Sequence, residues 1–310
     1  MKTFFATIFF TNLLILNSLA LAVGDKPSLR SLSTELKKGA EITSLFSQRN
    51  SLNSQQWQQV KGLFQSNATL KKKFFHSVQQ SEAFARGEIE DEKILQFLTQ
   101  LLQLSILQIR QASHAKNSAL LWDEVETWFH FTADLSYEES TLVGLRLAHL
   151  FRSLLFDELE FLLKNQQALL VGGYSKAQAL RIPWPVDRVI LFEAKRALSG
   201  AAMNVAMAAA KEFQKNNYQS LAVILTHVKG GQAKDFDFLR KIWRDDDVDM
   251  MKNEVNRLQL IQAGCRWADH FARANKNPMS WQDLQIAAPI DYTTGRPMDW
   301  SRLIATMQKE

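Results

Sequence analysis

Polar side chains recur every three or four residues through segment 138–167, and this spacing constrains the fold more than any other feature. The recurring positions, separated mostly by Leu and Phe, are Arg146, His149, Ser153, Asp157, Glu160 and Lys164. Because an α-helix has 3.6 residues per turn, such a period gathers the polar residues on one face and the apolar ones on the other. The segment is therefore predicted to be an amphipathic helix packed against neighbours.

Further segments of helical length show the same kind of pattern. They are 28–48, 54–66, 69–86, 91–116, 118–134, 187–214, 235–243 and 247–275. Segment 218–228 suits either a helix or a buried strand, and we choose the helix. The sequence therefore predicts an all-α fold, an irregular multi-helix bundle of about ten helices closed by a short C-terminal turn or hairpin.

Three regions are predicted along the chain. Residues 1–22 form a signal peptide, 23–288 a helical domain, and 289–310 a turn-rich C-terminal tail. A candidate sub-boundary lies near 170–186, where paired glycines and a Pro-Trp-Pro run interrupt the helical pattern. In the tail, Thr294-Gly295 and two prolines rule out a continuing helix.

The N-terminal segment predicts export. Met1 and Lys2 give a short basic start, residues 3–22 carry no charge, and Ala20-Leu21-Ala22 has the small-x-small pattern of a signal-peptidase site. We predict cleavage after Ala22. The alternative is an uncleaved segment, since a bilayer-spanning helix needs roughly 20 apolar residues. In that case the protein would be a membrane-tethered scaffold.

The distribution of charge and the single cysteine reduce the classes of function that the sequence allows. The chain has 37 Lys+Arg against 32 Asp+Glu, spread along its length rather than gathered in one basic region. Nucleic acid is not expected as a partner, because phosphate tracking needs a concentrated basic footprint. The lone cysteine, Cys265, lies in an apolar helical pattern and is predicted to be a small buried residue rather than a nucleophile.

One predicted helix face carries the best candidates for chemistry. The metal-ligand candidates are Asp123, Glu126, His130 and Asp134, and the catalytic candidates are Glu126, His130 and His149. The following helix is expected to present His149, Asp157 and Glu160 toward this face. Di-metal bundles, however, use Glu-x-x-His on two helices, whereas Glu126 and His130 are four apart without a second copy. A solvated polar face is therefore the preferred interpretation.

No cofactor is predicted. The acidic run at 245–249 has Met250 where a calcium loop needs glycine and Asn256 where it needs a bidentate glutamate. The run is expected to cap and stabilise the N-terminus of the next helix.

The segment 256–300 resembles a C-terminal module of exported or membrane-anchored helical proteins from Gram-negative bacteria and planctomycetes. That module ends in a P-x-D-P-[FY]-[ST]-G-[KR]-P-[LF]-x-[YW] box, and a related loop occurs in pseudopilins. This chain supplies Pro289, Asp291, Tyr292, Thr294, Gly295, Arg296, Pro297 and Trp300. It lacks the second proline of the box and has Thr293 as an extra residue. The resemblance implies Gram-negative-type export to a periplasmic or secreted location, and it implies no catalytic residue.

The box is expected to form a structural clasp. Asp291 can accept backbone N–H bonds within the turn, Gly295 can adopt a positive φ angle, and Pro297 stiffens the backbone after the turn. Trp300 and Tyr292 are predicted to bury against the helices.

The sequence therefore predicts an exported interaction or accessory component of the envelope, without enzymatic activity. Its expected partner is a protein or another envelope component, and membrane contact is expected only if the N-terminal segment is retained. The alternative from another class is a helical metal-dependent or carboxylate-based hydrolase that uses Glu126 and His130.

Overall fold

The computed structural model describes residues 28–48, 52–79, 91–138, 142–180, 182, 201–215, 237 and 245–308. The helices in these residues are α2 (Leu29–Ser33), α3 (Gly39–Ser47), α4 (Ser54–Gln79), α5 (Glu92–His114), α6 (Ser118–Glu138), α7 (Leu142–Asn165), the 3₁₀ turn η2 (Gln167–Leu170), α8 (Tyr174–Ala179), α10 (Ala201–Lys215), α13 (Asp245–Ala274) and α14 (Trp300–Met307). The strands in the same residues, β1 (Ile290–Asp291) and β2 (Arg296–Pro297), form one antiparallel pair. The predicted all-α fold with a small C-terminal hairpin is confirmed.

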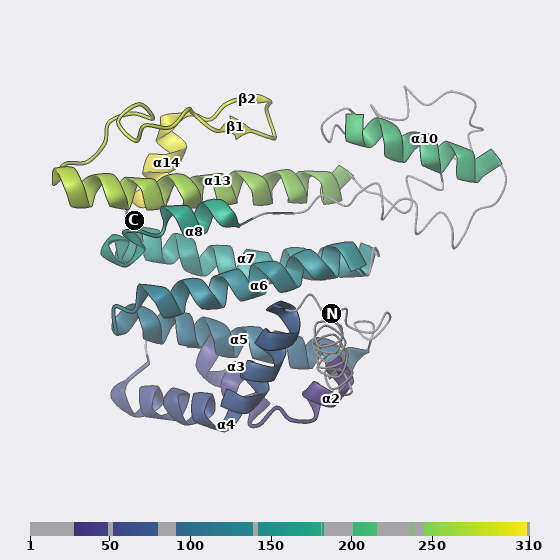
Figure 1. Ribbon diagram of the computed structural model, residues 1–310, viewed down its shortest axis with the longest axis vertical. Helices are drawn as coiled ribbons and strands as arrows, with labels where there is room; N and C mark the ends of the chain where they lie inside the picture. Colours follow the sequence, from purple (N-terminus) through teal and green to yellow (C-terminus); the bar gives the residue numbers. More distant parts are fainter. Residues whose placement is uncertain are drawn as a thin grey trace, which may run out of the picture.

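The long helices lie in successive layers (Figure 1). Helix α5 packs against α6, α6 against α7, and α7 against α13. Helix α4 contacts α5 and α6 at one side of the stack, while the tail with β1, β2 and α14 covers α13 at the other side. Each central helix is therefore covered on two sides, which explains the wide apolar arc of α5.

Aromatic side chains fill the centre of the stack. Trp128 of α6 has no exposed surface, and its ring centroid lies 5.3 Å from that of Phe74 in α4 and 5.8 Å from that of Phe151 in α7. Large aromatic rings in tilted and edge-on contact bury much apolar area and favour defined geometries. Trp128 therefore ties three helices into one core.

Two N-terminal predictions were wrong in detail. Segment 28–48 forms two helices rather than one: α2 ends at Ser33, and α3 begins after Lys38, which adopts a left-handed conformation with φ of 60°. The predicted break between 66 and 69 does not occur, and α4 runs through it. The reason is Asn67, which is buried and exchanges hydrogen bonds of 2.9 and 3.1 Å with the backbone of Lys37. Its amide serves a tertiary contact instead of ending the helix.

The remaining helix predictions agree with the described residues to within a few positions. Helix α5 begins after Asp91, whose carboxylate accepts the backbone N–H of Lys93 at 2.9 Å. The predicted interruption near 170–186 contains η2 and α8, with Gly172 at a positive φ of 78°. The acidic run at 245–249 forms the first turn of α13 instead of preceding it.

Some predictions fall outside the described residues. They concern the signal peptide, the end of the predicted helix 69–86, the whole Pro-Trp-Pro run, the first part of the predicted helix 187–214, and segments 218–228 and 235–243, apart from residue 237. The tail differs from its prediction, because α14 adds a helix to a region that was expected to be only turn-rich.

None of the helices in the described residues is both long and apolar enough to cross a membrane.

Candidate functional site

The four metal-ligand candidates lie on α6. Asp123 and His130 are exposed, whereas Glu126 and Asp134 are half-buried. Glu126 is committed to an ion pair with Lys176 of α8, with a nitrogen-to-oxygen distance of 3.0 Å. Across the described residues, no group of three or more His, Cys, Asp or Glu side chains is placed to hold a metal ion.

The prediction that α7 presents its polar residues toward these candidates was wrong. His149, Asp157 and Glu160 lie on α7 but face α13 instead of α6. Arg257 of α13 donates hydrogen bonds to Asp157 at 2.6 Å and to Glu160 at 2.7 Å. Helical periodicity identifies a polar face but not its neighbour, and here the neighbour comes from far along the chain. His149 therefore does not join Glu126 and His130.

The α7–α13 interface holds charged residues at two depths. Arg152 and Glu254 are fully buried and form a bidentate ion pair, in which Arg152 donates hydrogen bonds of 3.0 and 2.9 Å to the two carboxylate oxygens. His149 lies beside this pair, its Nδ1 3.0 Å from a Glu254 oxygen. Nearer the surface, burial lowers the pKa of Arg257, but hydrogen bonds and charges from Glu160 and Asp157 outweigh burial and raise it.

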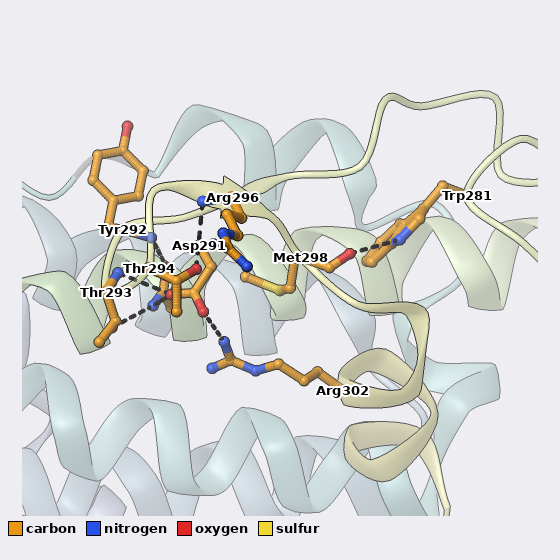
Figure 2. A network of polar contacts seen from close by, with 9 residues as sticks. Trp281, Asp291, Tyr292, Thr293, Thr294, Arg296, Met298 and Arg302 are labelled. Carbon is orange, nitrogen blue, oxygen red and sulfur yellow. Dashed lines mark hydrogen bonds and ion pairs between the residues drawn. The ribbon is translucent and has the colours of Figure 1, made fainter.

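The tail contains a compact polar network, shown in Figure 2. One carboxylate oxygen of Asp291 accepts hydrogen bonds from the Asn256 side chain at 2.7 Å and the Thr293 N–H at 2.9 Å. The other oxygen accepts from Arg302 at 2.7 Å. Asn256, on α13, also accepts the N–H of Tyr292 at 2.9 Å. The network therefore joins the hairpin to α13 and α14.

The charge state of Asp291 follows from this network. Desolvation raises the pKa of its carboxyl, but the Thr293 N–H, the Asn256 amide and the Arg302 charge together hold it below the ordinary value. Asp291 is therefore ionised at neutral pH, and the predicted clasp role is supported by its contacts. The pKa of Asp299, which caps α14, is also lowered, by hydrogen bonds from Ser301.

The hairpin turn depends on Gly295. Its φ angle is 69°, and its N–H donates to the Asp291 carbonyl at 2.7 Å. This is the positive φ angle that the sequence predicted, and glycine adopts it at little cost. The turn aligns Ile290 opposite Pro297 and Asp291 opposite Arg296 in the strand pair.

Trp300 and Tyr292 have different environments. Trp300 is half-buried, stacked on Trp267 with a centroid distance of 5.6 Å and edge-on to Trp281 at 5.0 Å. Tyr292 was predicted to be buried, but it is 37% exposed and points away from the polar network (Figure 2). Strand β1 ends at Asp291, which is buried, and Tyr292 is the first residue of the exposed turn that follows.

A cleft along α5, lined also by residues of α3, α4, α6, α7 and η2, was not predicted from the sequence. It consists of three adjoining hollows of about 210, 170 and 440 Å³. The first two share Arg110 and Glu158, and the last two share Ser113, His114 and Gln166. We call these hollows together the α5 cleft.

Arg110 lies at the floor of the α5 cleft. It is buried, donates to Glu158 of α7 at 3.0 Å and to the Phe46 carbonyl at 3.2 Å, and lies over the Phe46 ring. Its sequence signal was a lone arginine near the end of a strongly apolar helix. Such a residue needs a buried partner, but the sequence does not say from which helix the partner comes.

Cys265 has the environment that the sequence predicted. It is fully buried, and burial raises the pKa of its thiol well above the ordinary value. A protonated buried thiol packs as a small apolar group.

Searches against known proteins give no match for this chain among family models, curated proteins or solved structures. The resemblance of segment 256–300 to the envelope module therefore stays a prediction.

Proposed function

We propose that this protein is exported to the periplasm or secreted, and that it serves as an interaction or accessory component whose C-terminal hairpin contacts a protein partner. The basic start, uncharged run and small-x-small site at 1–22 support export. The resemblance of segment 256–300 supports an envelope or secreted location.

The outer face of the hairpin carries the proposal. It consists of Ile290, Tyr292 and Pro297, all exposed. Ile290 and Pro297 are cross-strand partners, and Tyr292 is the first residue of the turn that follows β1. Exposed apolar side chains that lie together on a rigid support are typical of binding surfaces.

The polar network makes this support rigid. Asp291 lies between Ile290 and Tyr292 and is fixed from the inner side by Asn256 and Arg302. A surface held in one conformation loses little entropy on association, so more of the apolar burial contributes to affinity.

Copurification from the native host tests the proposal. Tagged wild-type protein and the double variant Ile290→Ser/Tyr292→Ser are isolated from the envelope and culture medium, and bound proteins are quantified by mass spectrometry. We expect a specific partner that the double variant captures about tenfold less, the loss expected from about 1.4 kcal/mol of binding energy. Met279→Ser is the matched control, because Met279 is an exposed apolar residue outside the hairpin.

Two outcomes would contradict the proposal. One is that the wild type and the double variant capture the same proteins in equal amounts, although circular dichroism shows that both are folded. The other is wild-type protein found only in the cytoplasm. The intact mass also separates the two forms of export, since a mature chain beginning at Val23 indicates cleavage and an uncleaved mass indicates a tethered scaffold.

A further inference from the structure

The α5 cleft has an aromatic wall on one side. Trp57 of α4 and His114 of α5 meet edge to face, with ring centroids 4.9 Å apart. Trp57 is half-buried and His114 exposed, and Phe161 continues the apolar lining. The face of an aromatic side chain can pack against C–H groups on the face of a ligand ring, and this contact does not require a charge on the ligand.

The floor of the cleft is polar but electrically balanced. Arg110 and Glu158 are both buried and neutralise each other. At this pair a ligand with a net charge would gain no unmatched counter-charge, and it would still have to give up its hydration. The other acidic or basic residues that line the cleft are Lys116 in the hollow of about 440 Å³ and Asp157 in that of about 210 Å³, and their charges have opposite signs. The floor therefore favours a neutral ligand that forms hydrogen bonds.

Among the described residues, hydrogen-bonding capacity is left over at this floor. The Nε and Nη1 atoms of Arg110 are engaged, whereas its Nη2 has no acceptor among the described residues. His114 likewise makes no hydrogen bond within the described part of the chain, and Gln166 uses its carbonyl oxygen for the Ser113 hydroxyl. Counted over the described residues, donors from Arg110 and Gln166, together with the His114 ring, can serve a bound molecule.

We propose that the α5 cleft is a binding site for a neutral oligosaccharide. A sugar ring presents C–H groups on its faces and hydroxyl groups around its edge, which matches an aromatic wall beside a neutral polar floor. The hollow of about 170 Å³ beside Trp57 takes one ring. The hollow of about 440 Å³ shares His114 and Gln166 with it, so the chain of sugars continues there. This site is separate from the hairpin and does not depend on the function proposed for it.

Titration of the purified protein tests the assignment. The protein, expressed from its full-length sequence, is titrated with chitotetraose, cellotetraose and maltotetraose, and binding is measured by calorimetry and by NMR shifts of the His114 ring. We expect at least one of the three to bind with a dissociation constant below about 1 mM and to shift the His114 signals.

Variants locate the binding. His114→Ala and Trp57→Ala are each expected to weaken binding about tenfold, which is the scale of one lost aromatic contact. His114 is exposed, so His114→Ala leaves the fold intact and keeps the test decisive even if Trp57→Ala unfolds. His130→Ala is the matched control, since His130 is an exposed histidine on α6.

The proposal is overturned by any of three results. One is that folded wild-type protein binds none of the three tetrasaccharides with a dissociation constant below about 1 mM. Another is that binding is equally strong in the His114→Ala and His130→Ala variants, which would place the sugar elsewhere. Binding of polygalacturonate alone, an anionic polymer, also contradicts a neutral site.

Discussion

At the residue scale, buried basic side chains decide which helices face each other. Arg152 pairs with Glu254 and Arg110 with Glu158, each across two helices. Lys71 of α4 donates to Glu124 of α6 at 2.6 Å, and its pKa is lowered because burial outweighs the attraction of that carboxylate. Such pairs contribute little net stability, but an unpaired buried charge is strongly destabilising. They therefore exclude other arrangements of these helices.

Asp291 gives a stability prediction that depends on pH. The pKa of its carboxyl is below the ordinary value in the folded state, so the unfolded state binds more protons between the two values. The stabilisation is present above the unfolded pKa of roughly 3.9 and is lost as the pH falls through the folded value. Asp291→Asn is expected to lower the unfolding free energy by about 1–3 kcal/mol at pH 7.

The measurement is urea unfolding of both proteins from pH 7 down to pH 3. The difference between wild type and Asp291→Asn should shrink as the pH drops below roughly 4. Asp123→Asn is a suitable control, because Asp123 is exposed and should show little difference at any pH. A difference that stayed constant with pH would mean that the charge of Asp291 has no part in the clasp.

At the element scale, Gly264 brings α13 close to α7 and α14. A Cβ atom there would lie 2.6 Å from a Leu163 methyl and 3.1 Å from the Met307 sulfur. Gly264→Ala must therefore push the helices apart or force side chains from their rotamers, at a cost of about 1–3 kcal/mol. We expect a lower unfolding free energy in urea for this variant.

Gly62 on α4 provides the matched control. A Cβ atom there meets nothing within 4 Å, and the residue is exposed. Gly62→Ala should raise stability by up to about 1 kcal/mol, because alanine has the higher helix propensity. If the two substitutions changed stability in the same direction, close packing at Gly264 would not be the cause.

Helices could be predicted from the sequence where local features, such as an apolar arc or a capping residue, determine their bounds. Helix α5 has a wide apolar arc and an Asp91 cap, and its bounds follow from both. The α2–α3 junction was not predictable, since the left-handed conformation of Lys38 has no signal in the residue type. The continuity of α4 was missed because Asn67 was interpreted by local preference, whereas its partner lies in another segment.

At the scale of the whole molecule, the site was less predictable than the fold. The polar face of α7 followed from periodicity, but the helix that covers it, α13, did not. The α5 cleft joins Trp57, Arg110 and Gln166 from three different parts of the chain, and no spacing in the sequence links them. The hairpin was anticipated because its turn depends on local residues, above all Gly295.

The tail, predicted as a separate region, is part of the main core. Leu303 and Met307 of α14 are buried in the same apolar cluster as Leu163 of α7. Trp300 stacks on Trp267 of α13, and Met298 accepts the Trp281 indole N–H at 3.1 Å. Helix α14 contacts both α7 and α13, so the end of the chain closes the stack.

Removal of residues 289–310 should therefore destabilise the whole protein. Two fully buried side chains on α14 alone contribute roughly 1.5–3 kcal/mol each, and a loss of that size lowers the Tm by roughly 10 °C or more. The newly exposed surface of α13 should also bind a hydrophobic dye in the native state. Scanning calorimetry and dye fluorescence check both, with Tyr292→Ser as the control, because the exposed Tyr292 ring adds little to the core. An unchanged Tm without dye binding would show that the tail is an appendage.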